Sequence, residues 1–218
     1  MLITNSNIKM SAEQEKINKE QLILEAAEQE FFTKGYNGAR TTTIAERAGV
    51  THAMLHYYYR TKEQLFEKIL DKNMSPITNI MISAMGNTDL PFVERLKQSI
   101  ASHFDFVANN PLLPHFILNE IISRPERYEM MQNKLSAAAN DIFSNMQAEI
   151  DQLSQRGEIE WIDAKMLFMS IFSLNIFPFV AYPMAELIMG DIMADREQFI
   201  QQRKAENVEI IMRRIKKI

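Results

Sequence analysis

The sequence predicts an all-α fold, and three observations support this prediction. The chain has 218 residues but only 6 glycines and 7 prolines, whereas average usage gives about 15 and 11. This shortage disfavours turn-rich β folds and Gly-rich phosphate loops. Apolar residues recur at helical spacing, and capping residues and glycines separate successive segments. The chain has no cysteine, which excludes disulfides, thiolate metal sites and cysteine nucleophiles and fits a reducing compartment.

The amino-terminal segments have clear start and stop signals. Ser11–Gln14 has the form of a capping box, and a helix of about six turns should follow it and end at Gly35. We expect residues 1–10 to be disordered, with Met10 as an alternative start. Two short helices are expected at 42–48 and 52–58.

Later helices follow the same signals. Thr61–Gln64 is a second capping box and starts a helix that should reach Met85, with a kink or split at Pro76. Further helices are expected at about 89–110, 111–114, 125–157, 163–190 and 195–217. Residues 166–185 are uncharged over the length of a membrane span, but Pro178, Pro183 and interspersed polar residues favour a buried interface helix.

Residues 42–59 have the pattern of a helix-turn-helix. Two helices that cross steeply need a small residue at the contact and a residue that tolerates positive φ in the turn, and Ala45 and Gly49 meet these needs. Thr51 can cap the second helix. Apolar residues shared by both helices, Leu55 among them, would pack in a common core. The pattern predicts a DNA-binding motif.

These segments resemble the TetR family of transcriptional regulators. The similar stretches are Ile23-x-x-Ala26-Ala27-x-x-x-Phe31-x-x-x-Gly35-Tyr36, Ile44-Ala45-x-x-Ala48-Gly49-Val50-Thr51 and Leu55-x-Tyr57-x-Tyr59-x-x-Lys62-Glu63-x-Leu65. The specific match covers about residues 20–70. The resemblance implies a DNA-binding domain over 11–61 and a larger helical ligand-binding and dimerisation domain over 62–218.

The resemblance also implies roles for single residues. Side chains facing phosphates would be Thr41, Thr42, Thr51, Tyr57 and Lys62, and those facing base edges would be His52, Ala53 and His56. Arg40 is a further candidate DNA-binding residue. The chain departs from the family pattern at Arg40, where Ser or Thr is usual, and at both histidines. These departures affect base preference and single phosphate contacts rather than the fold. His52 and His56 are spaced for a shared metal, but Ala53 stands where a zinc protease carries its Glu, so a metal site is disfavoured.

The net charge of −4 is unusual for a DNA-binding protein. Residues 1–70 hold nine Lys/Arg and nine Asp/Glu, so they are neutral, and residues 71–218 hold fifteen against nineteen. The whole deficit lies in the second part. DNA affinity must therefore come from a few side chains at defined positions in a dimer rather than from a basic surface.

The carboxy-terminal part is rich in residues that line adaptable apolar pockets. Twelve of the fifteen Met and ten of the thirteen Phe follow residue 70, which predicts a cavity for a small hydrophobic effector. Plain core packing is the alternative for any one of them. The candidate ligand-binding residues are His103, Phe104, His115, Phe116, Asn119, Glu120, Phe172 and Asn175.

A homodimer is expected because one short recognition helix reads only a few base pairs. The predicted interface consists of Phe168, Phe172, Ile176, Phe179, Phe199, Ile210 and Ile211. The chain shows no enzyme motif, and no cofactor or metal is expected. We therefore expect a cytoplasmic repressor that binds double-stranded DNA and releases a palindromic operator when a ligand binds. A small-molecule binding or adaptor protein without operator binding is the alternative.

Overall fold

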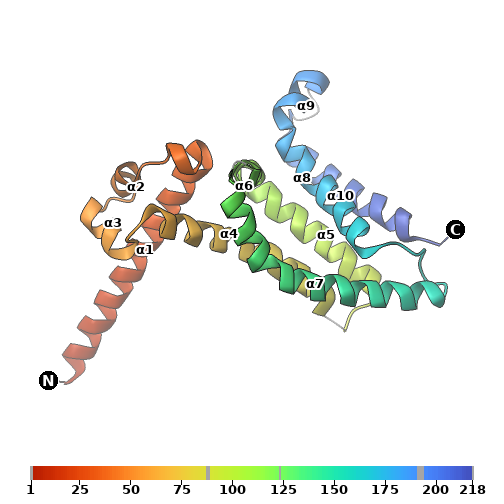
Figure 1. Ribbon diagram of the computed structural model, residues 1–218, viewed down its shortest axis with the longest axis horizontal. Helices are drawn as coiled ribbons and strands as arrows, with labels where there is room; N and C mark the ends of the chain where they lie inside the picture. Colours follow the sequence, from red (N-terminus) through yellow and green to blue (C-terminus); the bar gives the residue numbers. More distant parts are fainter. Residues whose placement is uncertain (1, 87–88, 123, 191–193, 218) are drawn as a thin grey trace. The chain divides into compact units, whose positions relative to one another are not determined.

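The computed structural model describes residues 2–86, 89–122, 124–190 and 194–217, and within these ranges the regular elements are helices with no strand. The all-α prediction is therefore confirmed. The chain divides into two compact units, Met1–Met74 and Ser75–Ile218 (Figure 1).

The amino-terminal unit contains α1 (Leu2–Gly38), α2 (Thr41–Arg47), α3 (His52–Tyr58) and the first turns of α4 (Lys62–Gly86). In place of the predicted disorder over 1–10, α1 includes residues 2–10; Met1 lies outside the described residues. Neither Pro nor Gly occurs between residues 2 and 34, so nothing in this stretch interrupts a helix. The expected break does occur at Gly35, whose φ of 64° is not helical.

The core of this unit explains where the chain divides. Ile23 and Phe31 of α1 are buried, as are Leu65 and Phe66 of α4. The Phe31 and Phe66 rings meet edge to face with centroids 5.2 Å apart. Because the first turns of α4 complete the core of the amino-terminal unit, the division falls at Met74/Ser75 and not at the predicted 61/62. Helix α4 continues through Pro76 without a split.

The carboxy-terminal unit contains the rest of α4 and six further helices. These are α5 (Phe92–Asn109), α6 (Leu113–Ile122), α7 (Pro125–Gln155), α8 (Ala164–Val180), α9 (Tyr182–Met189) and α10 (Arg196–Ile215). Helix α5 packs against both α8 and α10. The main core is formed by residues of α5, α7, α8 and α10, with Ile100, Ile150, Leu167 and Ile211 almost completely buried.

The uncharged segment near the carboxy terminus is bent, as its prolines predict. It breaks at Ala181 into α8 and α9, with Pro178 inside α8 and Pro183 in the first turn of α9. No single helix among the described residues has the length and apolar composition of a membrane span. Helices α8 and α9 meet these criteria only as a pair, and the pair is bent by 70°.

Candidate DNA-binding surface and ligand cavity

The helix-turn-helix has the geometry that its sequence predicts. Gly49 adopts a φ of 67°, which a residue with a Cβ rarely tolerates. The amide of Val50 donates to the Ala45 carbonyl at 3.0 Å and closes the turn. Thr51 caps α3, because its hydroxyl accepts from the Met54 amide at 3.1 Å. With Leu55 buried beneath it, α3 is held with a defined outward face.

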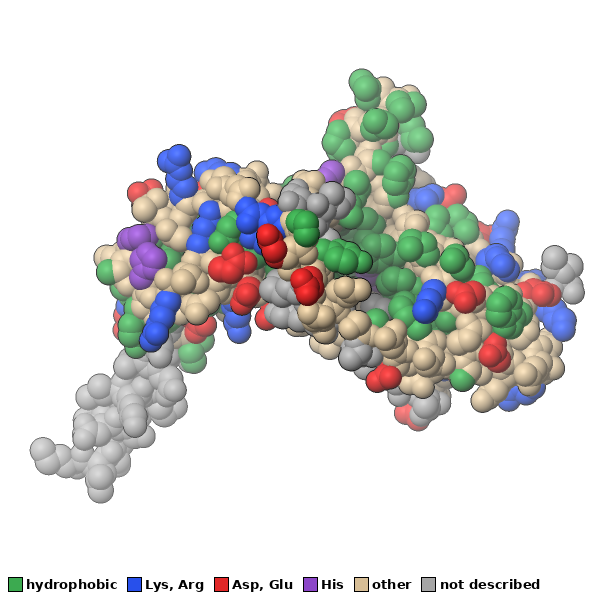
Figure 2. Space-filling model, viewed as in Figure 1, with side chains coloured by type: hydrophobic (Ala, Val, Ile, Leu, Met, Phe, Trp, Pro, Cys, Tyr) green, Lys and Arg blue, Asp and Glu red, His purple; other side chains and the backbone are tan. Residues whose placement is uncertain are grey.

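The predicted DNA-contacting residues of α3 lie on this outward face. His52, Ala53, His56 and Tyr57 are exposed, as is the cap Thr51, and histidine side chains form a purple patch on the amino-terminal unit in Figure 2. The His52 and His56 rings meet edge to face at 4.4 Å. Within the described part of the chain, no group of three potential ligands forms a metal site.

The start of α2 adds to this surface. Arg40 and Thr42 are exposed and Thr41 is partly buried. The Thr41 hydroxyl lies 3.0 Å from His52 Nε2, so the first turn of α2 is linked to the first turn of α3. This contact orients the His52 ring.

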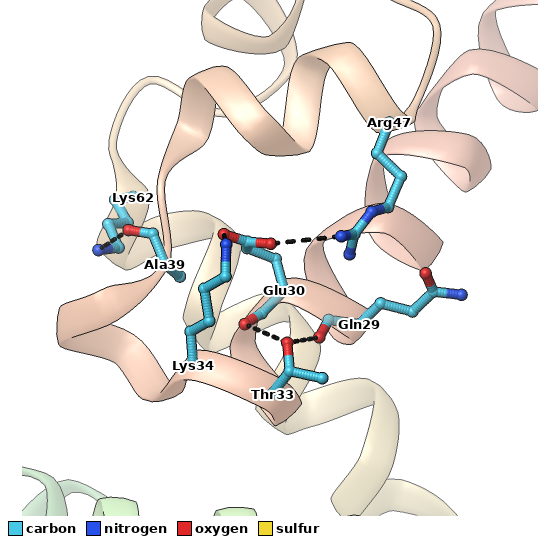
Figure 3. Close-up of polar contacts among 7 residues, drawn as sticks. All are labelled: Gln29, Glu30, Thr33, Lys34, Ala39, Arg47 and Lys62. Atoms are coloured by element: carbon cyan, nitrogen blue, oxygen red, sulfur yellow. Dashed lines mark hydrogen bonds and ion pairs between the residues drawn. The ribbon is translucent and has the colours of Figure 1, made fainter.

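Lys62 has a structural role that the sequence did not indicate. Its Nζ donates to the Ala39 carbonyl at 2.5 Å (Figure 3) and lies 4.6 Å from the centroid of the Tyr36 ring. The ammonium thus holds the segment between α1 and α2. The predicted phosphate contact of Lys62 stays a prediction.

A buried carboxylate joins the helices of the amino-terminal unit. Glu30 of α1 is 0% exposed and pairs with Lys34 Nζ at 2.8 Å and with the Arg47 guanidinium of α2 at 3.6 Å, as Figure 3 shows. Burial by itself raises the pKa of Glu30, but Lys34, the Arg40 backbone amide and Arg47 together bring this pKa below its usual value. The charged form therefore fixes α2 against α1.

Sequence reasoning missed Glu30 because a Glu at a helical position has no local signal that distinguishes a buried side chain from a solvated one. Two further polar contacts join distant parts of the same unit. The Tyr59 hydroxyl donates to Glu20 at 3.1 Å, and Asn73 Nδ2 donates to Glu28 at 2.6 Å. The first contact joins the end of α3 to α1, and the second joins α4 to α1.

The carboxy-terminal unit contains an apolar cavity between α4, α5, α7 and α8. The cavity volume that the centre of a water-sized sphere can reach is about 60 Å³, within about 670 Å³ of empty space that includes open solvent. Its lining residues are Ile77, Ile80, Phe92, Leu96, Ser99, Ile100, His103, Ile142, Phe143, Met146, Phe168, Ile171 and Phe172. Only Ser99 and His103 among them carry polar side chains. The α5 residues recur at intervals of three and four. This helical periodicity in the sequence is the signal that could have identified them as one face of the helix.

His103 is the polar group of this wall with the most unusual environment. It is 7% exposed, its ring stacks on Phe172 with centroids 5.7 Å apart, and its Nδ1 lies 3.0 Å from Asn175 Nδ2. Burial lowers the pKa of His103 to about 4. The imidazole is therefore neutral near pH 7.

The other predicted ligand residues lie away from the cavity wall. Asn175 is buried behind His103, and Phe104 packs against Phe179. Phe116 is buried elsewhere in the core, whereas His115 and Asn119 are exposed. Glu120 pairs with Arg127 of α7. A polar residue within an apolar segment therefore does not have to face the cavity, because a neighbouring helix or solvent can satisfy it.

The predicted dimer interface stays a prediction, and three of its four α8 residues, Phe168, Phe172 and Ile176, are half-buried in this unit. Phe168 and Phe172 line the cavity, while Ile176 and Phe179 pack against the core around Phe104. On α10, Ile211 is also buried, whereas Ile210 is exposed and Phe199 is partly exposed.

The exposed apolar residues of α8 lie on another face, and they continue onto α9. They are Met166, Met169 and Phe177 on α8 and Met184, Leu187, Ile188 and Met189 on α9. Figure 2 shows hydrophobic side chains gathered over α9 and the adjoining end of α8. This set is called the α8–α9 apolar surface below.

The exposed α3 of one unit and the apolar cavity of the other define a helix-turn-helix DNA-binding protein with a helical ligand-binding unit. Residues 23–69 match the model of the family described as "Bacterial regulatory proteins, tetR family". The chain is a transcriptional regulator of the TetR family.

Individual relatives agree with this assignment. The transcriptional activator FasR of Mycolicibacterium smegmatis is 22% identical over 155 residues, which cover 71% of this chain and 67% of FasR. The transcriptional repressor BepR of Brucella suis is 26% identical over 143 residues, covering 64% and 68%. The structure of the regulator FadR from Bacillus subtilis in complex with stearoyl-CoA has the same fold, with a TM-score of 0.63, 19% identity and coverage of 90% and 99%.

Proposed function

We propose that this protein is a cytoplasmic repressor that binds a palindromic operator as a homodimer and releases it when a small hydrophobic molecule enters the cavity. The observation that carries this proposal is the apolar cavity in a unit separate from the one that presents α3. A protein that only bound DNA would have no need of such a cavity.

The geometry of α3 supports the DNA-binding part. Its exposed face presents groups that can donate to phosphates or read base edges, namely Thr51, His52, His56 and Tyr57. One helix of seven residues reaches few base pairs. Two copies spaced by about one turn of DNA, or roughly 34 Å, would double the contacts and produce a palindromic site.

The α8–α9 apolar surface supports the homodimer. Phe177 is 68% exposed and Leu187 is 84% exposed. Contiguous exposed apolar side chains on a protein surface usually mark an interface. A second copy would cover this surface through a two-fold axis.

The chemistry of the cavity wall supports a hydrophobic effector. Eleven of the thirteen lining residues within the described part of the chain have apolar side chains, so transfer of an apolar molecule from water to this site is favourable. FadR, which has the same fold, was solved with stearoyl-CoA, a ligand with a long apolar chain.

Selection of binding sites from random double-stranded DNA tests the operator part of the proposal. We expect a palindromic consensus with two half-sites. Selection with the variant His52→Ala should return a changed half-site if His52 contacts a base. The control is Gln198→Ala at an exposed position of α10, and selection with it should return the wild-type half-site. Recovery of no consensus would favour the adaptor alternative. A reporter gene with the selected site separates repression from activation, both of which occur among the relatives.

A pair of serine variants on α5 tests the link between cavity and operator. Ser99 lines the cavity, and Ser102 on the same helix is exposed. The variant Ser99→Leu should reduce the thermal shift caused by lipophilic cations, acyl compounds or bile-like acids and abolish operator release, with operator affinity unchanged. Ser102→Leu should behave as wild type. Release that is equally strong in both variants would contradict a role of the cavity.

A further inference from the structure

A chain of hydrogen bonds runs from α10 through α8 to the cavity wall. Asn207 Nδ2 of α10 donates to Asn175 Oδ1 of α8 at 3.0 Å and to the Leu174 carbonyl at 2.9 Å. Asn175 Nδ2 then donates to the Ile100 carbonyl of α5 at 2.9 Å and lies 3.0 Å from His103 Nδ1. Asn175 and Asn207 are 0% exposed, so water does not compete for these bonds.

This chain determines which nitrogen of His103 carries the proton. The Ile100 carbonyl is an acceptor, so the Asn175 atom bonded to it must be the NH₂ group. The same NH₂ group therefore donates to His103 Nδ1, which must accept. In a neutral imidazole that accepts at Nδ1, the hydrogen lies on Nε2.

The Nε2–H group of His103 is a buried donor with no protein acceptor among the described residues. The ring that carries it lines the cavity and is held by the stack on Phe172. A buried donor without an acceptor is destabilising, and native proteins usually retain one only where something else satisfies it. The group is therefore placed to bind an acceptor that enters the cavity.

We propose that the effector is an uncharged molecule with an apolar body and one hydrogen-bond acceptor, of the kind found in an ester, amide or thioester carbonyl, which accepts from His103 Nε2. This inference rests on the proposed function, because it specifies the ligand class of that cavity. The lining residues that the structure describes include no Lys, Arg, Asp or Glu, so a charged head group would lose its hydration without gaining a counter-charge from them. A neutral carbonyl needs only the one donor that the wall offers.

Three ten- or eleven-carbon probes separate the possible head groups: methyl decanoate, decanoate and undecane. Their binding at pH 7 can be measured by displacement of the neutral apolar dye N-phenyl-1-naphthylamine from the full-length protein without DNA. We expect methyl decanoate to bind more tightly than decanoate. Tighter binding of decanoate would overturn the proposal, since the site would then favour a carboxylate.

The variant His103→Phe tests the donor itself. Phe keeps a ring that can stack on Phe172 but has no N–H group. The ratio of the methyl decanoate affinity to the undecane affinity should fall about 3- to 10-fold in this variant, as expected for one net hydrogen bond. Differences in the hydration of the two probes cancel in this comparison. An unchanged ratio would refute the assignment.

Ser99→Ala is the matched control, because Ser99 is the other polar residue among the described lining residues and its hydroxyl already donates to the Arg95 carbonyl at 2.9 Å. Its affinity ratio should remain that of wild type. A second measurement does not depend on any variant: the chain has 4 histidines, and ¹⁵N NMR should show His103 as the Nε2–H tautomer. An Nδ1–H tautomer would contradict the hydrogen-bond chain.

Failure of this inference is distinguishable from failure of the proposed function. If methyl decanoate binds through His103 but releases no operator, the ligand class stands and the regulatory proposal fails. If operator release requires an open cavity but is independent of His103, the regulatory proposal stands and the assigned donor is wrong.

Discussion

Neutralising the buried carboxylate of Glu30 should weaken the DNA-binding unit without affecting the ligand-binding unit. The substitution Glu30→Gln keeps the shape of the side chain but removes its charge. Lys34 Nζ at 2.8 Å, the Arg40 amide and the Arg47 guanidinium at 3.6 Å then lose an anionic partner. Since Arg47 lies on α2, the loss loosens the helix that supports α3.

The structure sets the size of this effect. Breaking a buried ion pair costs about 3–5 kcal/mol when the remaining charge stays buried. Here the side chains of Lys34 and Arg47 are 48% and 40% exposed, so water solvates both after the change. Glutamine also still accepts hydrogen bonds. We therefore expect a loss of about 2 kcal/mol, as for one charge-assisted hydrogen bond, and a melting temperature lower by about 8–16 °C for a unit of this size.

The two units can be followed separately in one melt. The single tryptophan, Trp161, lies in the carboxy-terminal unit, whereas circular dichroism reports helices of both units. Glu30→Gln should shift the circular dichroism transition and leave that of Trp161 fluorescence in place. Glu46→Gln is the matched control, because this Glu of α2 is exposed. A decrease in the free energy of unfolding smaller than about 0.5 kcal/mol, which is the range of ordinary surface substitutions, would refute the reasoning.

The stabilisation that the Glu30 carboxylate provides should decrease as the pH falls. The pKa of Glu30 is lower in the folded protein than in the unfolded chain, so the folded state binds this proton more weakly. The stabilisation is present above the unfolded value of about 4.3 and is lost as the pH falls through the folded pKa. The difference between wild type and Glu30→Gln should therefore be full at pH 7 and shrink below about pH 4.

Three further predictions concern other positions. Gly49→Ala should destabilise the amino-terminal unit by about 1–2 kcal/mol, measured by urea unfolding, because a Cβ there meets no atom within 4 Å and the cost is that of positive φ alone. Lys62→Ala should reduce the slope of log K against log salt by about 0.9 and also lower the melting temperature; an unchanged slope would assign Lys62 to structure alone. Phe177→Glu on the α8–α9 apolar surface should yield a monomer in sedimentation, with Ser102→Glu as an exposed control, and a persistent dimer would place the interface elsewhere.

The sequence by itself determined the features that depend on near neighbours in the chain. Thr51, Thr61 and Asp163 each cap the helix that follows, through bonds to amides two or three residues later. Gly49 supplies the positive φ of the turn. Such interactions span a few residues, so spacing alone reveals them. The helix-turn-helix and the family could be recognised for this reason.

Only the tertiary structure decided which side of each helix faces the interior. Helix α8 is apolar on all sides, so its sequence has no stripe that selects a face. Packing against α5 and α7 turned Phe168 and Phe172 inward and left Met169 and Phe177 exposed. The role of His103 depends on Asn175, 72 residues later in the chain. Burial and hydrogen bonding between distant helices follow from packing, which no local pattern records.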